Sequence, residues 1–153
     1  MANTYTQIYI QYVFAVQNRA SLINEKWQTQ LYKYISGIAE KHEHKLFAIN
    51  GMPDHLHVLI SMNPKQAPSD LMYHIKRSSS LWVNDNKLVA GKFSWQEGFG
   101  AFSYGKSQIP DIARYIENQQ QHHKKRSFIE EYIELLNAFG IEYDERYIYK
   151  PIE

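Results

Sequence analysis

The chain has 153 residues, of which 44% are hydrophobic and 22% charged, as in a single folded domain spanning residues 1–153. The formal net charge is +1, so the overall charge gives no argument for a nucleic-acid partner. Any basic surface that binds nucleic acid must be a local patch. The absence of cysteine excludes disulfides and thiolate metal sites, which fits a reducing cytoplasm. Neither a signal-peptide pattern nor an apolar run of membrane-spanning length is found, so we expect a soluble cytoplasmic protein without a membrane partner.

The N-terminal part of the chain predicts a strand followed by a helix. Apolar and polar residues alternate over residues 5–16, which predicts a long strand with one apolar face. Asn24 is expected to cap a helix that runs to about His42, because apolar residues then recur at helical spacing. These apolar positions are Trp27, Leu31, Tyr34, Ile35 and Ile38.

A hairpin and a second helix are expected next. Residues 46–50 and 56–62 flank the turn sequence Gly51-Met52-Pro53-Asp54, which predicts two antiparallel strands. Ser69 is expected to cap a helix over residues 69–80 or beyond. The residues expected to face inward on this helix are Leu71, Met72, Ile75 and Ser79.

The remaining segments predict short strands over residues 93–95 and 99–103 and a helix over residues 110–119, with proline in its first turn. A capping box at Ser127 opens a further helix, which ends at Gly140. The order β, α, β, β, α, β followed by helices predicts an α+β fold of the ferredoxin-like split βαβ type. In this sandwich we expect one antiparallel sheet with helices on one face, plus a C-terminal helix that carries chemistry.

The most informative motif is the histidine pair in Asp54-His55-Leu56-His57-Val58-Leu59-Ile60. Side chains alternate along a strand, so His55 and His57 face the same side as a two-nitrogen metal clamp, while Leu56 packs behind them. Tyr115 and Gln119 are expected to share one face of a helix. Each residue alone also fits a structural role, as a half-buried imidazole, a core tyrosine or an exposed amide. Together they indicate phosphodiester chemistry.

Two imidazoles and an amide carbonyl suit Mg²⁺ or Mn²⁺ with positions left open for water and phosphate oxygens. Such a cation would act as a Lewis acid on the scissile phosphate. The hydroxyl of Tyr115, with an ordinary pKa of about 10, needs a metal or a cationic neighbour to attack at neutral pH. Its attack would leave DNA covalently attached to the protein.

Several further motifs, in the same order, resemble the small single-tyrosine transposases of the HUH (histidine, hydrophobic, histidine) superfamily, which move insertion sequences as single-stranded DNA. They are Ile75-Lys76-Arg77-Ser78-Ser79-Ser80, Trp95-Gln96-Glu97-Gly98-Phe99-Gly100-Ala101-Phe102-Ser103, Tyr115-Ile116-Glu117-Asn118-Gln119-Gln120-Gln121-His122-His123 and Phe139-Gly140-Ile141-Glu142-Tyr143-Asp144-Glu145-Arg146-Tyr147. The resemblance implies that His55, His57 and Gln119 hold the metal and that Tyr115 forms a 5′-phosphotyrosine and releases a 3′-hydroxyl. It also implies hairpins of single-stranded DNA as partner, a homodimer whose subunits share active sites, and DNA in a prokaryotic cytoplasm as the setting.

Basic side chains offer local DNA contacts. Lys76 and Arg77, expected to reach solvent, are candidates for hairpin phosphates, and Lys124 and Lys125 lie in a positive run directly after the tyrosine helix. The competing explanation for all of them is an ordinary solvated charge. Trp95 and Phe99 can stack on bases or fill the core, and we expect the core.

Other functions remain open from the sequence. A replication-initiator or relaxase-like nickase uses the same His pair and tyrosine, and a host-retained relative would process palindromes. A non-catalytic protein that binds hairpins of single-stranded DNA would use the same basic and aromatic residues. A metallohydrolase that activates water is disfavoured, because no Asp or Glu accompanies the His pair as a further ligand or base.

Overall fold

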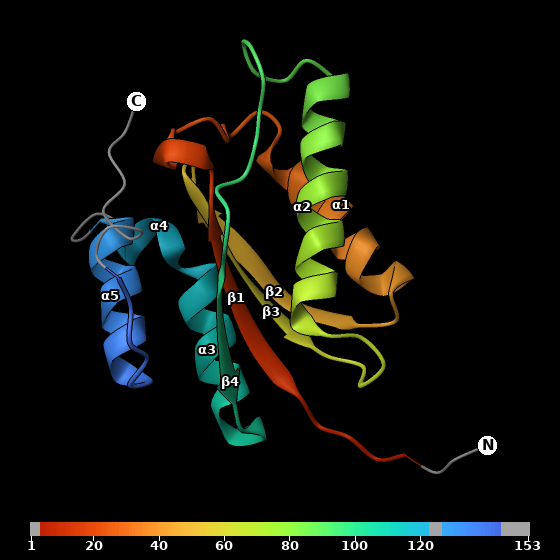
Figure 1. Ribbon diagram of the computed structural model, residues 1–153, viewed down its shortest axis with the longest axis vertical. Coiled ribbons are helices and arrows are strands. Elements are labelled where there is room, and N and C mark those ends of the chain that lie inside the picture. Colours follow the sequence, from red (N-terminus) through yellow and green to blue (C-terminus); the bar gives the residue numbers. More distant parts are fainter. Residues whose placement is uncertain (1–3, 123–126, 145–153) are drawn as a thin grey trace.

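The computed structural model describes residues 4–122 and 127–144 and confirms an α+β fold (Figure 1). One antiparallel sheet has the strand order β2-β3-β1-β4. The strands are β1 Tyr9–Ala15, β2 Lys45–Met52, β3 His55–Ser61 and β4 Gly100–Tyr104. The helices are α1 Gln28–Lys41, α2 Pro68–Asp85, α3 Ile109–Glu117, α4 Gln119–His122 and α5 Phe128–Ala138, with short 3₁₀ turns at Gln17–Arg19 and Lys106–Gln108. Within the described ranges no helix has both the length and the apolar character needed to cross a bilayer.

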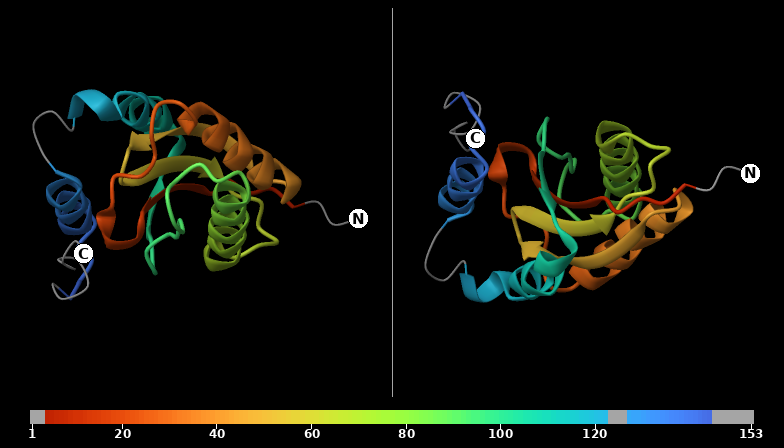
Figure 2. Two further views of the ribbon diagram at one scale, coloured as in Figure 1. Left: turned by 90° about the horizontal axis from the view of Figure 1, so that it is seen from above. Right: turned by 90° about the horizontal axis from the view of Figure 1, so that it is seen from below.

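Helices cover both faces of the sheet, so the expectation of helices on one face is wrong (Figure 2). The reason lies in the central strands, which are apolar on both sides. On β1, Tyr12 and Phe14 pack with α1 and α2 in the larger core, whereas Val13 and Ala15 pack with α5. A strand buried on both faces requires a cover on each, and α3 and α5 supply the second cover.

Two helix starts differ from the sequence prediction. α1 begins at Gln28, and the side chain of Asn24 instead accepts the Lys26 N–H in the turn before it. The N-cap of α2 lies two residues earlier than expected, at Ala67 with Pro68 in the first turn, so Ser69 is not the cap. Proline has a fixed φ and no N–H, which suits the first helical position and explains the shift. The expected hairpin and the inward face of α2 are confirmed.

The segment over residues 93–98 is not a strand, apart from one isolated bridge between Val16 and Trp95. Side chains of α2 hold it in place. Asn84 bonds both the N–H and the carbonyl of Phe93, and Ser79 Oγ accepts from the indole of Trp95. Lys76 Nζ donates to the carbonyls of Gln96 and Gly98. Polar side chains of a helix thus supplement the two backbone bonds that this segment makes with Ala15 and Gln17.

In the hairpin between β2 and β3, the backbone at Gly51 approaches the backbone of His55 closely. A Cβ added to Gly51 would lie 2.1 Å from the carbonyl oxygen of His55, a separation that no side chain tolerates. Glycine is therefore required where β2 passes over the start of β3. This contact fixes the point from which the histidine strand begins.

Candidate metal and tyrosine site

The His pair lies on the central strand β3, where His55 is opposite Ala15 and His57 is opposite Val13 of β1. Both imidazoles are fully buried, and their rings lie 5.3 Å apart between centroids. They face the same side of the sheet, as the alternation of a strand predicts, and this is the side covered by α3 and α5.

A second layer of polar groups orients each ring. His55 Nδ1 lies 2.7 Å from the carboxylate of Asp54, which leaves Nε2 directed to the centre of the site. His57 Nδ1 lies 2.8 Å from Gln11 Nε2, while the hydroxyl of Tyr104 donates to Gln11 Oε1 at 2.7 Å. A carboxylate or amide behind an imidazole fixes the orientation of the ring and the place of its proton, as in many metal centres.

Glu131, from α5, is the centre of the site and was not found from the sequence. Its carboxylate is 1% exposed, with Oε1 2.8 Å from His57 Nε2 and 3.5 Å from His55 Nε2. Oε2 accepts from the hydroxyl of Tyr115 and, at 3.1 Å, from the amide of Gln119. The sequence carried one sign that Glu131 is buried. It lies three residues after Phe128 and four before Leu135, a spacing that places all three on the inward face of the helix.

Tyr115 and Gln119 do not share one helix, contrary to the sequence prediction. α3 ends at Glu117, Asn118 leaves the helical conformation, and α4 begins at Gln119. The side chain of Asn50, on β2, donates to the carbonyl of Glu117 at 2.8 Å and so pairs a backbone group at the break. Both Tyr115 and Gln119 nevertheless converge on Glu131, since each donates to its Oε2.

The donor set fits a divalent cation. His55, His57 and Glu131 each offer one ligand atom, and these atoms lie within 4.8 Å of one another. Gln119 is fully buried, and its Oε1 has no hydrogen-bond partner among the described residues. A buried carbonyl oxygen without a partner is costly, and a cation at this point would satisfy it. Two imidazoles with a carboxylate and an amide oxygen suit Mg²⁺, Mn²⁺ or Zn²⁺ chemistry.

Two opposing effects set the pKa of His55, namely its burial and its acidic neighbours. Burial lowers the pKa of His55, but the hydrogen bonds and charges of Asp54 and Glu131 outweigh it and raise this pKa above 6.5. A proton and a cation therefore compete for the same imidazole.

A cavity of about 250 Å³ opens beside the tyrosine, between α3 and α5. Its lining includes Tyr115 and Glu131 together with Gln11 and Tyr104. The rings of His57 and Tyr115 lie 6.1 Å apart between centroids. Tyr115 and Glu131 thus border a cavity from which a substrate can approach, while His57 is buried beside them.

The residues expected to contact DNA or bases differ in their surroundings in the structure. Lys76 is half-buried, its Nζ donates to two backbone carbonyls, and burial lowers its pKa to about 8; its contact with hairpin phosphates stays a prediction. Its neighbour Arg77 is exposed on α2. Lys124 and Lys125 lie outside the described residues. Phe99 packs against the larger core, and Trp95 is part of it.

Known proteins match this chain at the level of family and fold. The family described as "Transposase IS200 like" matches residues 4–119. A protein of Deinococcus radiodurans R1, provisionally described as a transposase, shares 20% identity at a TM-score of 0.63 over 78% of this chain and 95% of its own. A REP-associated tyrosine transposase, bound to a REP hairpin, shares 16% identity at a TM-score of 0.59 over 80% of this chain and 73% of its own.

No curated protein shows a comparable match. The two solved structures share the fold, and the family match covers more than half of the chain, including the His pair, Tyr115 and Gln119. Glu131 and the rest of α5 lie beyond the matched residues. This protein belongs to the family of IS200-like transposases.

Proposed function

We propose that this transposase cuts and rejoins single-stranded DNA through a covalent link to Tyr115. The observation that carries the proposal is the convergence of the Tyr115 hydroxyl and both imidazoles on the buried carboxylate of Glu131. In the reaction the oxygen of Tyr115 forms a bond to the scissile phosphorus, and the bond from phosphorus to the 3′ oxygen breaks. The products are a 5′-phosphotyrosine and a free 3′-hydroxyl, and a second strand end can reverse the step.

His55, His57 and Glu131, with the open oxygen of Gln119, would hold the divalent cation, for which Mg²⁺ and Mn²⁺ are the proposed candidates. When bound, the cation supplies Lewis-acid stabilisation of the phosphate oxygens. Oε2 of Glu131 already accepts the hydroxyl of Tyr115, so it is placed to receive the proton that the tyrosine loses, and that proton can pass to the leaving 3′ oxygen.

Binding of a cation by His55 and His57 requires that the ring proton of each lies on the nitrogen that faces away from the cation. Binding through Nε2 of His57 requires the ring proton on Nδ1, so the amide of Gln11 must turn its oxygen toward the ring. The hydroxyl of Tyr104 can accept as well as donate, and therefore permits either orientation of that amide. At His55 no change is needed, because Asp54 already accepts from Nδ1.

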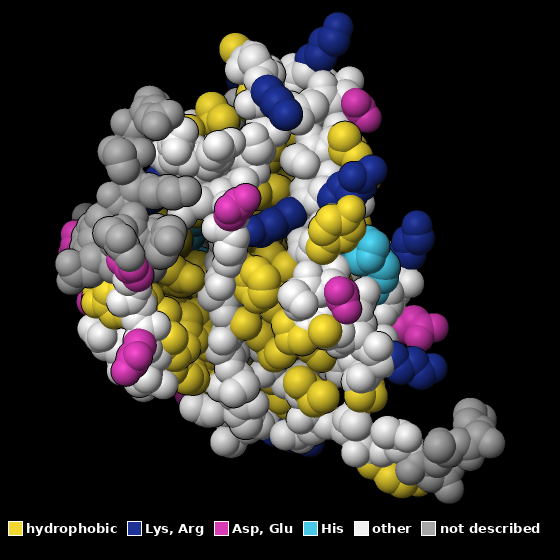
Figure 3. Space-filling view, viewed as in Figure 1, with side chains coloured by type: hydrophobic (Ala, Val, Ile, Leu, Met, Phe, Trp, Pro, Cys, Tyr) yellow, Lys and Arg dark blue, Asp and Glu magenta, His cyan; other side chains and the backbone are white. Residues whose placement is uncertain are grey.

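The substrate we propose is a hairpin of single-stranded DNA. A structural neighbour is bound to a REP hairpin, which supports this choice. On the face seen in Figure 3, Lys and Arg side chains lie over α2 and the segment after it with acidic side chains among them, whereas the charged side chains over α5 are acidic. Lys76 and Arg77 on α2 are the described residues that we propose for hairpin phosphates, with Lys124 and Lys125 retained as candidates.

One chain assembles all the residues of the proposed site, from β3, α3, α4 and α5. A homodimer remains a prediction, and sharing of the tyrosine between subunits is not required for this geometry.

Labelled hairpin oligonucleotides taken from DNA beside the gene, incubated with Mg²⁺, Mn²⁺ or chelator, test the proposal. We expect an adduct that resists denaturant, needs metal, and is lost in Tyr115→Phe but kept in Tyr73→Phe, a matched change at an exposed tyrosine on α2. Tight hairpin binding without an adduct would instead identify a binding protein that does not cut.

A metallohydrolase is the second candidate, because Glu131 supplies the acidic ligand whose absence counted against it. This enzyme would turn over DNA with water as nucleophile. Cleavage that survives Tyr115→Phe without a covalent species would favour it.

A further inference from the structure

Asn50, on β2, is the centre of a group of hydrogen bonds that joins the two halves of the proposed site. It lies directly opposite His57 of β3. Residues that face each other across two antiparallel strands point to the same side of the sheet, with Cβ atoms about 4.5–5.5 Å apart. The side chain of Asn50 therefore lies next to a proposed metal ligand, on the side of the sheet where α3 and α4 pack.

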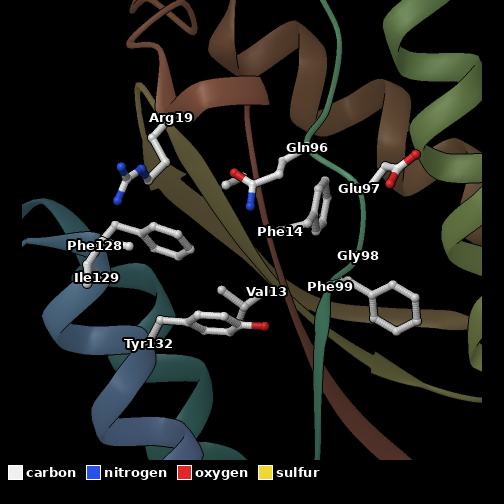
Figure 4. Close-up of a pocket in the computed structure, with 11 residues that line it drawn as sticks. Val13, Phe14, Arg19, Gln96, Glu97, Gly98, Phe99, Phe128, Ile129 and Tyr132 are labelled. Carbon is white, nitrogen blue, oxygen red and sulfur yellow. The ribbon is translucent and has the colours of Figure 1, made fainter. Parts of the chain in front are cut away.

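The two histidines are supported in different ways. His55 has an apolar support, because the ring of Phe128 stacks on its imidazole with centroids 4.4 Å apart. That ring also stacks on Tyr132 at 5.4 Å and lines a cavity of about 200 Å³ between β1 and α5 (Figure 4). His57 instead has the polar side chain of Asn50 as its neighbour across the strands, and Asn50 bonds the break between α3 and α4.

Every hydrogen-bonding group of the Asn50 side chain has a partner. Its Oδ1 accepts from the N–H of Gly51 at 2.9 Å, which fixes the orientation of the amide. Its Nδ2 donates to the carbonyl of Glu117 at 2.8 Å and to Oε1 of Gln120 at 3.1 Å. Nε2 of Gln120 donates in return to Oδ1 of Asn50 at 3.0 Å and to the carbonyl of Gly51 at 3.2 Å. The last residue of α3 and the second residue of α4 are thus bonded to the same side chain.

The two helices differ in how they are anchored. α3 packs through apolar side chains such as Ile116, which is fully buried against the sheet. α4 has the sequence Gln119-Gln120-Gln121-His122 and offers no apolar side chain for packing. Its position therefore depends on polar contacts, and those of its described side chains run to β2 and to Glu131.

We propose that Asn50 is a positioning residue that sets the place of Gln119 for the divalent cation, which rests on the proposed function, where Oε1 of Gln119 is a ligand. The amide of Gln119 donates to Oε2 of Glu131 at 3.1 Å, and its Oε1 has no hydrogen-bond partner in the described chain. Asn50 bonds the backbone two residues before Gln119 and the side chain one residue after it. Both flanks of the ligand are therefore fixed to the strand that pairs with the histidine strand. Groups that orient a ligand from behind are a general source of metal affinity.

Asn50→Leu tests the proposal, since it keeps the size of the side chain and removes its hydrogen bonds. The control is Asn63→Leu, at another half-buried asparagine, in the loop after β3. Asn63 makes the same kinds of bond, because its Nδ2 donates to the carbonyl of His42 at 2.9 Å and its Oδ1 accepts from the N–H of Lys65 at 2.7 Å. Each change is made alone and together with Gln119→Met, which removes the ligand itself. Binding of Mn²⁺ is measured by calorimetric titration at a temperature at which circular dichroism shows each variant folded.

We expect Asn50→Leu to weaken Mn²⁺ binding about tenfold, as the loss of a group behind a metal ligand does. In the Gln119→Met background the same change should have no further effect, because the residue that it positions is gone. Asn63→Leu should leave the affinity unchanged in both backgrounds. If Asn50→Leu does not fold, Gln120→Met removes part of the same contact from an exposed position, and a weaker affinity that depends on Gln119 is again expected.

A purely structural role of Asn50 gives a different pattern. Asn50→Leu would then weaken Mn²⁺ binding equally with and without Gln119, which overturns the proposal, as does an affinity that Asn50→Leu leaves unchanged. In the adduct assay, the Mn²⁺ concentration for half-maximal rate should rise about tenfold while the rate at saturating Mn²⁺ is kept; the opposite split overturns the proposal.

Failure of the proposed function is a distinct result. A wild type that binds Mn²⁺ but forms no adduct refutes the chemistry and leaves the positioning of Gln119 measurable by titration. No binding of Mn²⁺ by the wild type overturns the metal centre, and this proposal with it.

Discussion

Glu131→Gln separates the roles of the residues at the candidate metal centre. The substitution keeps the shape of the side chain and removes its charge, at a position that is 1% exposed and 2.8 Å from His57. If Glu131 is a ligand, binding of Mn²⁺ should stabilise the native protein far more than the variant. For each protein we compare the melting temperature with Mn²⁺ and with chelator. This difference does not include the effect of the mutation on the stability of the metal-free fold.

The size of the effect follows from mass action. A cation at about 100 times its dissociation constant stabilises the folded state by about 2.7 kcal/mol. A chain of this size gains about 2–4 °C per kcal/mol, so we expect a rise of about 5–10 °C in the wild type. Loss of one charged ligand that weakens binding at least tenfold leaves about 1.4 kcal/mol at the same concentration, and thus about half that rise.

Glu134→Gln is the matched control, since Glu134 lies exposed on the same helix. We expect it to keep the full rise. Equal rises in Glu131→Gln and the wild type would refute the assignment of this carboxylate as a ligand and would leave Gln119 as the third ligand. No rise in any of the proteins would refute the metal centre itself.

Three further outcomes follow from the contacts. Lys76→Met removes both bonds from Nζ to the carbonyls of residues 96 and 98 and should lower the free energy of unfolding in urea by about 2 kcal/mol; a loss below about 0.5 kcal/mol would show that this segment holds without it. Gly51→Ala should lower the free energy of unfolding by more than about 2 kcal/mol, because the new Cβ meets the His55 carbonyl oxygen at 2.1 Å. Gly37→Ala is the control on α1, where a Cβ has nothing within 4 Å, and should raise the free energy of unfolding by about 0.5–1 kcal/mol. Equal effects of the two substitutions in urea melts would contradict the close approach at Gly51. In chelator, His55 has a folded pKa raised above 6.5, so its contribution to stability is complete below pH 6.5 and is lost as pH rises through the folded pKa; unfolding of His55→Gln should lack this dependence, and an unchanged pH profile would contradict the raised pKa.

Local patterns in the sequence were sufficient wherever the physical cause is itself local. The alternation of a strand places His55 and His57 on one side, and this is confirmed. The cap at Ser127 is confirmed, since its side chain accepts from the N–H of Glu130, and Gly140 follows the end of α5 with a positive φ of 65°. These features depend on neighbours within a turn of the chain, so spacing alone reveals them.

Long-range packing decided the rest. Glu131 lies 74 residues from His57, and no local pattern indicates that a helix packed over the second face of the sheet will bring its carboxylate to the imidazoles. The side chain of Asn50 bonds α3 where that helix breaks before Gln119, and the carbonyls of a distant loop turn Lys76 inward. The sequence determined the four strands of the sheet, the hairpin and the shared face of the histidines, because these follow from backbone periodicity, whereas the strand expected over residues 93–95 is absent. Only the tertiary structure decided which acid completes the site, because buried polar groups take whichever partner packing brings within hydrogen-bond distance.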